Sequence, residues 1–336
     1  MDLENFIKKD KSILIISSWP LDFDSIGSGL ILKKYLESLN KKVTLVFPMK
    51  LTEREKDFYK ILPHFDEVED RDTREFFKKK IFDLLILLDG SNLAQFYESS
   101  NKKENKPALE AYDRRIHIDH HLKNGELGTH TIRKTEVSST AEIIMDEIIP
   151  KNFIDEKIAT LGYAAIMQDT GNFKWSFYSS SLKLAGMLLE KGAEPFELLE
   201  RSFFSKTKTY LAMLKFAIEN IEYRDDIATS FLFLPYRKMR EEGINDEKLS
   251  ELKRAFEVEL AISVKGYARG IFIYEKRPKQ IAISARGSNI HNKINLPKML
   301  SGIGLEGGGH FNSCGFSTER DFKKVKDLIV GAIEEA

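Results

Sequence analysis

Acidic and imidazole side chains recur in this chain where predicted strands end. The residues are Asp22, Asp24, Asp89, Asp119, His120, His121 and Asp169. Each alone is explained by a turn, a helix cap or a surface position. Most of them, however, directly follow apolar runs that are expected to lie side by side in one sheet. Because ligands of parallel sheets bind beyond the carboxyl ends of the strands, we expect these side chains to converge on one site.

This set of side chains suits hard divalent cations. Carboxylates with one or two imidazoles, and no cysteine, favour Mg²⁺ or Mn²⁺, and Mn²⁺ more when histidine takes part. Two such ions about 3.5–4 Å apart need a bridging carboxylate; they deprotonate water and polarise a phosphoryl oxygen. Hydrolysis of a phosphoester most needs this help, because both the nucleophile and the phosphate are anionic. The residues therefore predict a metal-dependent phosphoesterase centre.

The first half of the chain alternates strands with helices. An apolar strand is predicted over 12–18, a helix over 24–40 and a second strand over 42–48, which is a βαβ unit. Further strands are predicted over 82–90 and 114–121. A capping box at Ser139–Glu142 and a pattern over 155–168 predict two more helices. A parallel sheet with helices on both faces is expected.

The second half has a different pattern. Amphipathic helices are predicted over 195–222, then strands over 227–235, 268–276 and 279–287, with a helix over 246–264 between the first two. A glycine-dense stretch follows over 302–316. The predicted class is α/β, with a parallel-sheet domain over 1–190, a helical linker over 191–225 and a smaller α/β domain over 226–336.

Composition restricts the partners. The 336 residues include 52 Lys and Arg and 52 Asp and Glu, so the formal net charge is zero. This balance disfavours long nucleic acids, although a local cluster of donors suffices for short ones. Cys314 is the one cysteine, which excludes an intrachain disulfide and predicts a small buried side chain. No signal peptide or membrane-length apolar run is visible, so a cytoplasmic protein without membrane contact is expected.

Seven short motifs share a resemblance to one family. They are "DFDSIGS" (22–28), "LDGSN" (88–92), "IDHH" (118–121), "VSSTAE" (137–142), "QDTGNF" (168–173), "SARGS" (284–288) and "GGGH" (307–310). In this order and spacing they resemble the DHH phosphoesterase superfamily, including its C-terminal DHH-associated substrate-binding domain. The resemblance covers nearly the whole chain.

The resemblance implies catalytic roles for the acidic residues. Asp22 would hold one Mn²⁺ ion and Asp24 the other, with Asp89 bridging them. His120 and Asp169 would complete the second site. Mg²⁺ is the alternative ion.

The resemblance also implies residues around the metals and the substrate. His121 would lie near the substrate phosphate, and Asp119 would orient the histidines. In the C-terminal domain Arg286 would hold a phosphate through its guanidinium, with Ser288 beside it. The remaining substrate contacts would be Gly307, Gly308, Gly309 and His310.

One position departs from the family pattern. The first motif usually begins with a histidine four residues before its first aspartate, and Ser18 stands there. A hydroxyl is a poorer Mn²⁺ ligand than an imidazole. Water could fill this place, the site could hold one ion tightly, or the protein could have changed its substrate or lost hydrolysis.

Three functions follow from the resemblance. The two-domain layout is similar to hydrolases of short oligonucleotides (nanoRNA), pAp (3′-phosphoadenosine 5′-phosphate) and pApA, which predicts a Mn²⁺-dependent phosphoesterase acting on such substrates. A cyclic dinucleotide phosphodiesterase is one alternative. A nucleotide-binding sensor or scaffold with impaired hydrolysis is the other. A processive exonuclease is disfavoured by the neutral charge. The apolar segment 141–149 could serve a homodimer contact.

Overall fold

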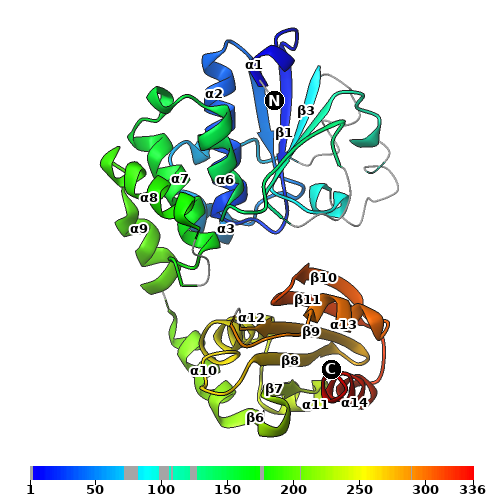
Figure 1. The fold of residues 1–336 in the computed structure, drawn as a ribbon. Helices are drawn as coiled ribbons and strands as arrows, with labels where there is room; N and C mark the ends of the chain where they lie inside the picture. The colour runs from blue at the N-terminus through cyan, green and yellow to red at the C-terminus, as the bar shows by residue number, and fades with distance from the viewer. Residues whose placement is uncertain are drawn as a thin grey trace. The chain divides into compact units, whose positions relative to one another are not determined.

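The computed structural model describes residues 3–71, 82–97, 106, 109–121, 127–174, 178–204, 206–288 and 290–336, without the side chains of Phe203, Glu306 and His310. The chain divides into two compact units, Met1–Ser205 and Lys206–Ala336. This division falls inside the segment 191–225 that the sequence predicts as a helical linker. Each unit is described by itself (Figure 1).

The N-terminal unit is built on a parallel sheet of five strands in the order β2-β1-β3-β4-β5. The strands are β1 (Ser12–Ser17), β2 (Lys42–Val46), β3 (Leu84–Leu88), β4 (Arg115–Asp119) and β5 (His130–Arg133). Every residue of β3 is buried, and so are five of the six residues of β1. Strands that are covered on both faces read as unbroken apolar runs, which is why the sequence reveals them.

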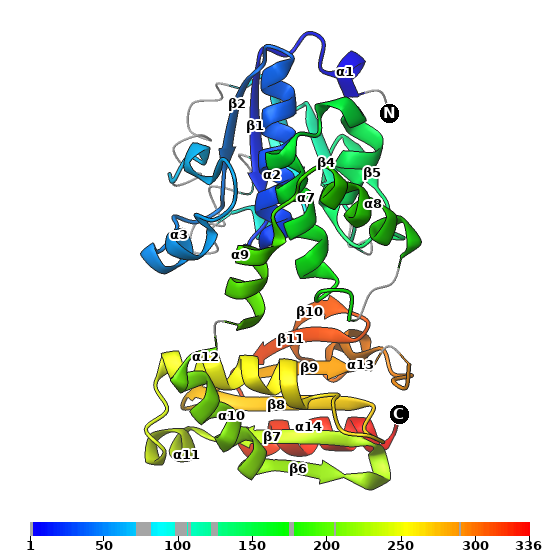
Figure 2. The same cartoon turned by 90° about the vertical axis from the view of Figure 1, so that its left-hand side faces the viewer.

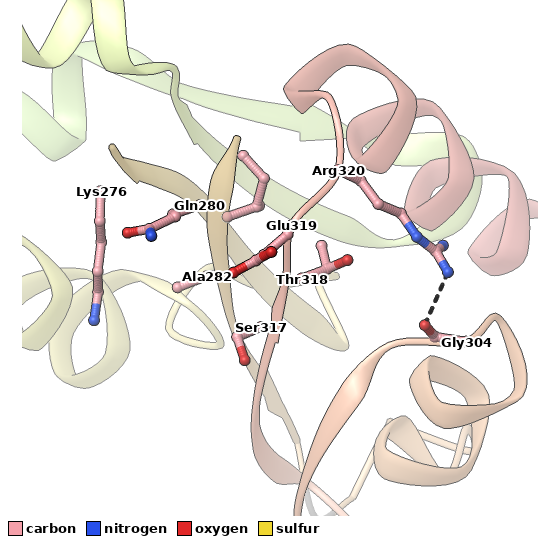
Figure 3. A pocket seen from close by; sticks show the side chains of 9 residues that line it. Lys276, Gln280, Ala282, Gly304, Ser317, Thr318, Glu319 and Arg320 are labelled. Carbon is pink, nitrogen blue, oxygen red and sulfur yellow. Dashed lines mark hydrogen bonds between the residues drawn. The ribbon is translucent and has the colours of Figure 1, made fainter. Parts of the chain in front are cut away.

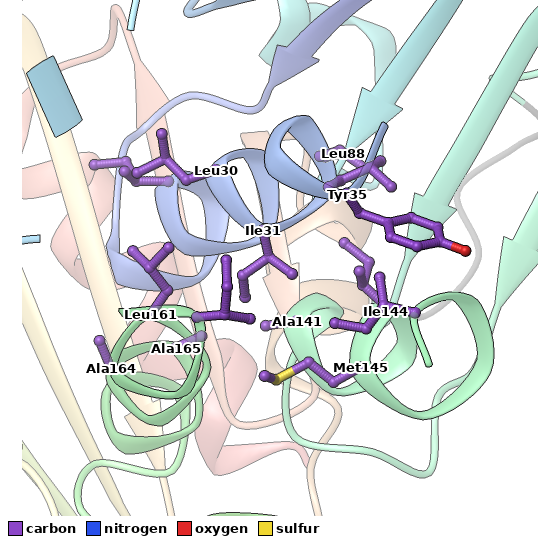
Figure 4. Packing of buried hydrophobic residues seen from close by; sticks show 14 of the residues in the cluster. Leu30, Ile31, Tyr35, Leu88, Ala141, Ile144, Met145, Leu161, Ala164 and Ala165 are labelled. Carbon is purple, nitrogen blue, oxygen red and sulfur yellow. The ribbon is translucent and has the colours of Figure 1, made fainter. Parts of the chain in front are cut away.

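Helices cover one face of this sheet. The three that pack closest together are α2 (Phe23–Ser38), α6 (Thr140–Ile143) and α7 (Glu156–Asp169). Figure 4 shows their contact, where Ile31 of α2 meets Leu161 and Ala165 of α7. On the other face, Phe96 and Tyr112 pack against Leu14, Ile16 and the neighbouring strands. The predicted cover on both faces is confirmed.

The remaining helical segments of this unit are short or peripheral. They are α1 (Leu3–Phe6), α3 (Glu53–Tyr59), η1 (Phe65–Glu67), η2 (Leu93–Phe96), η4 (Ile144–Ile148), η5 (Lys151–Phe153), α8 (Ser179–Glu190), α9 (Pro195–Leu199) and η6 (Glu200–Phe204).

The C-terminal unit holds a mixed sheet of six strands in the order β10-β11-β9-β8-β7-β6. Its strands are β6 (Ile221–Arg224), β7 (Thr229–Leu234), β8 (Arg269–Arg277), β9 (Gln280–Gly287), β10 (Glu306–His310) and β11 (Ser313–Thr318). Its helical segments are α10 (Lys208–Asn220), η7 (Asp225–Ile227), α11 (Tyr236–Glu241), α12 (Asp246–Ala255), η8 (Phe256–Leu260), α13 (Leu296–Gly302) and α14 (Phe322–Glu334).

Two apolar clusters lie on the two faces of this second sheet. Residues of α13 and α14 pack on one face against β7, β8, β9 and β11. Residues of α10, α12 and η8 pack on the other face, mainly against β7 and β8 (Figure 2). The predicted α/β class is therefore confirmed in both units.

Some local predictions need correction. The predicted capping box is one-sided: Ser139 caps α6 by accepting from the Glu142 amide, whereas the Glu142 carboxylate accepts from Ser138 and Ser181 instead. The glycine-dense stretch, for which no element was predicted, contains β10 and the start of β11, which pair with each other. Cys314 is buried as predicted, and burial raises the pKa of its thiol to about 12.

The segment 141–149 contributes to the core of its own unit, since Ile143, Ile144, Met145 and Ile149 are buried there. A homodimer contact through it remains a prediction. In the described part of the chain, no helix has the length and apolar character needed to cross a membrane.

Candidate metal centre

The predicted site residues lie where the strand order of the N-terminal sheet reverses. The chain leaves β1 toward β2 on one side and returns to β3 on the other side of β1. Loops that follow such neighbouring strands diverge, which opens a binding crevice at their carboxyl ends. Asp22 and Asp24 follow β1, Asp89 follows β3, and His120 follows β4. Register and topology thus bring together residues that lie far apart in the sequence.

Two groups of side chains could each hold a metal ion. One consists of Asp24, His120 and Asp169, and the other of Asp89, His120 and His121. In each group the donor atoms lie within 4.8 Å of one another. His120 belongs to both, with its Nε2 3.6 Å from Asp89 Oδ1 and 3.5 Å from Asp169 Oδ2. The first group contains three of the residues that the resemblance implies for the second ion.

Asp24 is held by the protein around it. Its Oδ2 accepts from the Thr140 amide at 2.7 Å, and its Oδ1 accepts from the Ala141 amide and the Ser28 hydroxyl, both at 2.9 Å. Thr140 and Ala141 begin α6, so the carboxylate lies at a helix N-terminus, where amide donors stabilise negative charge. Asp24 is fully buried. Because Oδ1 already accepts twice, Oδ2 is the oxygen with capacity left for a cation.

Asp89 occupies a backbone conformation that few residues adopt. Its φ is 62°, in the left-handed region that aspartate and asparagine tolerate better than most residues. Its amide donates to the Ile118 carbonyl, and its Oδ1 accepts from the Thr140 hydroxyl at 3.0 Å. Thr140 therefore contacts Asp24 through its amide and Asp89 through its side chain.

Asp119 orients His121, as the resemblance implies. His121 Nδ1 lies 2.8 Å from Asp119 Oδ1. Burial alone would raise the pKa of Asp119, but the hydrogen bond and charge of His121 outweigh it and leave the pKa below its ordinary value. Asp119 is thus an ionised acceptor, and Nδ1 of His121 is the donor. Although burial lowers the pKa of His121, the bond to Asp119 outweighs burial and raises it.

His117 supports this arrangement from within the sheet. Its Nε2 lies 2.9 Å from the Gly90 carbonyl oxygen, and burial lowers the pKa of the ring. Arg133 of β5 lies beside His117, with 3.4 Å between its Nη2 and His117 Nδ1, and its Nε lies 3.6 Å from Asp119 Oδ2. Among the described residues, neither side chain belongs to the two candidate groups.

Asp22, for which the resemblance implies a ligand role, caps a helix in the structure. Its Oδ1 accepts from the Ser25 amide at 2.7 Å and so caps α2. Among the described residues it belongs to neither candidate group. Its charge is nevertheless close to the centre: burial, followed by repulsion from Asp24, raises the pKa of Asp22 to about 6. Its role as a ligand remains a prediction.

The electrostatics of the cluster favour a cation. Burial, followed by repulsion from Asp24 and Asp22, raises the pKa of both Asp89 and Asp169 well above the ordinary value. A divalent ion among these carboxylates would remove that repulsion, and the oxygen and nitrogen donors match what Mn²⁺ and Mg²⁺ bind. The residues present therefore fit a metal.

The predicted substrate residues lie in the C-terminal unit. Arg286 forms a 2.8 Å salt bridge with Glu257 of η8, and its Nη1 donates to the Ala285 carbonyl. The Ser288 hydroxyl accepts from the amides of Ile290 and His291. The His310 side chain lies outside the described part of the structure.

The three predicted glycines are not equivalent. A Cβ at Gly307 would lie 2.2 Å from the Gly315 carbonyl oxygen, and one at Gly309 would lie 2.2 Å from the Ser313 oxygen. A Cβ at Gly308 would meet no atom within 4 Å. Close pairing of β10 with β11 therefore explains Gly307 and Gly309, and it does not explain Gly308.

Sequence reasoning missed two residues that shape the centre. Thr140 joins Asp24 to Asp89, and the motif "VSSTAE" that contains it was the available signal. Gln168 accepts from the Phe23 amide at 2.7 Å through Oε1, which ties the start of α2 to the end of α7. No local pattern reveals that contact.

Residues 12–166, which contain most of this centre, match the family described as DHH family, N-terminal domain. This part of the chain is similar to that family's N-terminal domain. The match includes the strands β1 to β5 and every candidate ligand except Asp169, which lies three residues beyond the end of the DHH domain match.

Comparisons with whole proteins extend over both units. The chain is 22% identical, over 98% of its length, to a "Membrane protein-large ribosomal subunit bL9 fusion protein" of Aster yellows witches'-broom phytoplasma (strain AYWB). It is 21% identical to the protein of the same name in Onion yellows phytoplasma (strain OY-M). The chain spans 37% of the length of each of these relatives.

A solved structure shares the fold. It is an exopolyphosphatase-related protein from Bacteroides fragilis, with a TM-score of 0.82 and 21% identity, over 99% of this chain and 94% of that one. At this identity the likeness shows a common fold alone.

Proposed function

We propose that this protein is a metal-dependent phosphoesterase that hydrolyses short oligonucleotides or small nucleotides such as pAp and pApA. The observation that carries the proposal is the convergence of Asp24, Asp89, His120 and Asp169 at the switch point of a domain similar to the DHH family's N-terminal domain. Mn²⁺ is the preferred ion because His120 belongs to both candidate groups.

The side chains of the centre would have different roles. Asp24, His120 and Asp169 would hold one ion, and Asp89 would face the other, to which the resemblance adds Asp22. Bound ions polarise a phosphoryl oxygen and lower the pKa of water. Asp119 keeps the proton of neutral His121 on Nδ1. Once the ring is charged, its Nε2 also carries a proton and donates a hydrogen bond to a phosphate oxygen.

The C-terminal unit would recognise the substrate. Arg286 presents a half-buried guanidinium whose place is fixed by Glu257 and the Ala285 carbonyl. Such a fork suits a phosphate better than a lysine would. Gly308 offers a surface without a side chain beside it.

Purified protein tests the proposal directly. With millimolar Mn²⁺, we expect release of phosphate from pAp and of mononucleotides from pApA and short RNA, and loss of turnover in EDTA. A cyclic dinucleotide should be included as a competing substrate. If none of these compounds is hydrolysed by protein that is shown to bind the metal, the proposal is contradicted.

A nucleotide-binding protein without hydrolysis is the second candidate. It is favoured by Asp22, which caps α2 and lies outside both candidate groups, and by the buried Ser18 at the position where the resemblance expects histidine. Metal stoichiometry separates the two functions, because two bound Mn²⁺ ions support hydrolysis and none supports binding alone.

Replacing Ser18 by histidine tests whether this position limits metal binding. We expect Ser18→His to tighten Mn²⁺ binding by about tenfold or more, since an added imidazole ligand is a stronger donor than a hydroxyl. Titration calorimetry with Mn²⁺ measures the change, and Ser18→Asn is the control for added bulk. An unchanged Mn²⁺ affinity in a folded Ser18→His variant would show that another group completes the site.

A further inference from the structure

One face of the C-terminal sheet is covered over only part of its width. The helices α10, α12 and η8 pack on β7 and β8, and η8 reaches β9 through Glu257, which accepts from the Ser284 hydroxyl. Beyond β9, Gly315 and Ser317 of β11 are exposed. This part of the face contains only small side chains among the described residues.

Three cross-strand rows define that part of the sheet. Running from β9 through β11 to β10 they are Arg286–Ser313–His310, Ser284–Gly315–Gly308 and Ala282–Ser317–Glu306. Because alternate residues of a strand point to the same face, the described side chains of the three rows share one face. A Cβ at Gly308 would meet no atom within 4 Å, and one at Gly315 would meet only the Ile283 oxygen, at 3.9 Å. We call this surface the open face.

A hollow of about 570 Å³ lies at the end of the open face that is farthest from Arg286. Ala282 and Ser317 belong both to the third row and to the lining of the hollow. Figure 3 shows Lys276 on one side and Arg320 on the other, with Glu319 between them. The volume lies in the range of small-molecule sites, roughly 300–1,000 Å³.

The charged groups of the hollow are available to a ligand. Arg320 donates to the carbonyl oxygens of Gly304 and Ile303, which fix its guanidinium in place. Within the described part of the chain, no salt bridge involves Lys276, Glu319 or Arg320. Lys276 lies over the Tyr274 ring, with its Nζ 5.9 Å from the ring centroid. Among the described residues neither cation is paired with a carboxylate, so both charges can face an anion, and Glu319 can accept from an amino or hydroxyl group.

We propose that this hollow binds the far nucleotide of a short oligonucleotide whose other end is held by Arg286. The inference rests on the proposed function. The Arg286 row and the Ala282 row are four residues apart along β9, which is about 14 Å at ~3.4 Å per residue. A stacked strand rises about 3.4 Å per nucleotide, so this distance is about four steps of a stacked strand; a single nucleotide cannot reach both ends, and a trinucleotide reaches them only when it is unstacked and extended.

The chemistry of the hollow suits a nucleotide. Lys276 and Arg320 bind its phosphate, and Glu319 accepts from an exocyclic amino group of the base or from a sugar hydroxyl. The open face between the two ends admits the connecting sugar and base because Gly308 and Gly315 carry no side chain. The protein thereby prefers substrates of two or more nucleotides over single nucleotides.

Calorimetry with AMP, pApA and pApApA, in EDTA so that nothing is hydrolysed, tests this inference on the full chain. The double variant Lys276→Met/Arg320→Met should raise the Kd for pApApA at least fivefold and leave the Kd for AMP within twofold. Arg286→Met should raise the Kd for AMP and the Kd for pApApA. Lys276→Met alone, which leaves the Arg320 hydrogen bonds to the backbone in place, should move the Kd for pApApA in the same direction. Lys298→Met is the matched control, because Lys298 belongs to α13, which packs on the opposite face of the sheet. This substitution should change neither the Kd for AMP nor the Kd for pApApA.

The outcomes separate this inference from the proposed function. Unchanged pApApA affinity in the double variant, in a protein that hydrolyses pApA with Mn²⁺, overturns the role of the hollow alone. Equal weakening of AMP and pApApA by the double variant also overturns it, because the hollow would then hold a mononucleotide. A wild-type protein that neither binds nor hydrolyses these compounds overturns both proposals.

Discussion

Asp89→Asn should abolish metal-dependent hydrolysis while making the metal-free protein more stable. Asp89 belongs to one of the two candidate groups of ligands, and loss of its charge should lower kcat by more than about 100-fold, since even residues behind metal ligands cost 10- to 100-fold. Asparagine also tolerates the positive φ at this position and can still accept from Thr140. The backbone should therefore stay in place.

The gain in stability has a defined pH dependence. Burial and the neighbouring carboxylates raise the pKa of Asp89 well above its ordinary value of 3.8, so the folded protein binds this proton more tightly than the unfolded chain. Stability of the metal-free wild type therefore falls as the pH rises between these two values. Below pH 4 the variant and the wild type should unfold alike, and the advantage of Asp89→Asn should grow toward neutral pH.

Asp83, at the other end of β3, provides the matched control. The amides of Ser12 and Lys11 donate to it and lower its pKa, so its contribution to stability is present above pH 3.8 and is lost as the pH falls. Asp83→Asn should therefore destabilise the protein at neutral pH and leave kcat unchanged. Thermal unfolding in EDTA from pH 4 to 8 measures both the expected stabilisation by Asp89→Asn and the expected destabilisation by Asp83→Asn. If Asp89→Asn is the less stable variant at pH 7, the cluster is not electrostatically strained.

Gly307→Ala should unfold the β10–β11 hairpin, whereas Gly308→Ala should leave it intact. A methyl group at position 307 would lie 2.2 Å from a backbone oxygen of β11, so the strands would have to separate. We expect a loss of about 3 kcal/mol or more, at the upper end of overpacking costs. At Gly308 the same methyl group points into open space, and the change in stability should stay within about 0.5 kcal/mol.

Urea unfolding of the two variants measures this difference. Neighbouring glycines that receive the same substitution share composition and strand propensity, so the contrast isolates the contact with β11. Equal destabilisation by both substitutions would contradict the strand pairing of β10. Gly331→Ala, within α14 and with no atom within 4 Å of its Cβ position, should be neutral or slightly stabilising.

Strands that are buried on both faces can be predicted from the sequence, because they form apolar runs. Strands that are partly exposed cannot be predicted in this way. The runs that form β1 and β3 are apolar throughout and were found. β5, with the sequence "HTIR", is half-exposed at the edge of its sheet and has no apolar run. β10 contains three glycines, which disfavour a strand, and it forms because Gly307 and Gly309 let β11 approach. That reason lies in a partner strand, beyond any local pattern.

The candidate site was predictable where strands supply the residues. Asp24, Asp89 and His120 follow β1, β3 and β4, and the rule for parallel sheets suffices to bring them together. The role of Thr140 depends on where α6 begins relative to Asp24, 116 residues away in sequence. For Asp22 both interpretations had been open, and the structure shows the cap directly. The open face could not be predicted from the sequence, because it is defined by the register in which β9, β11 and β10 pair.

The amide and hydroxyl groups around Asp24 bear on the order in which the centre is assembled. Thr140, Ala141 and Ser28 already fix both carboxylate oxygens, so the orientation of Asp24 does not wait for an ion. Proteins whose ligands are arranged only by their metal fold and load in one step. Here folding comes first, and the ion enters a site in which the Asp24 carboxylate is already oriented. Occupancy of the centre can therefore follow the free concentration of the metal without any change in the amount of folded protein.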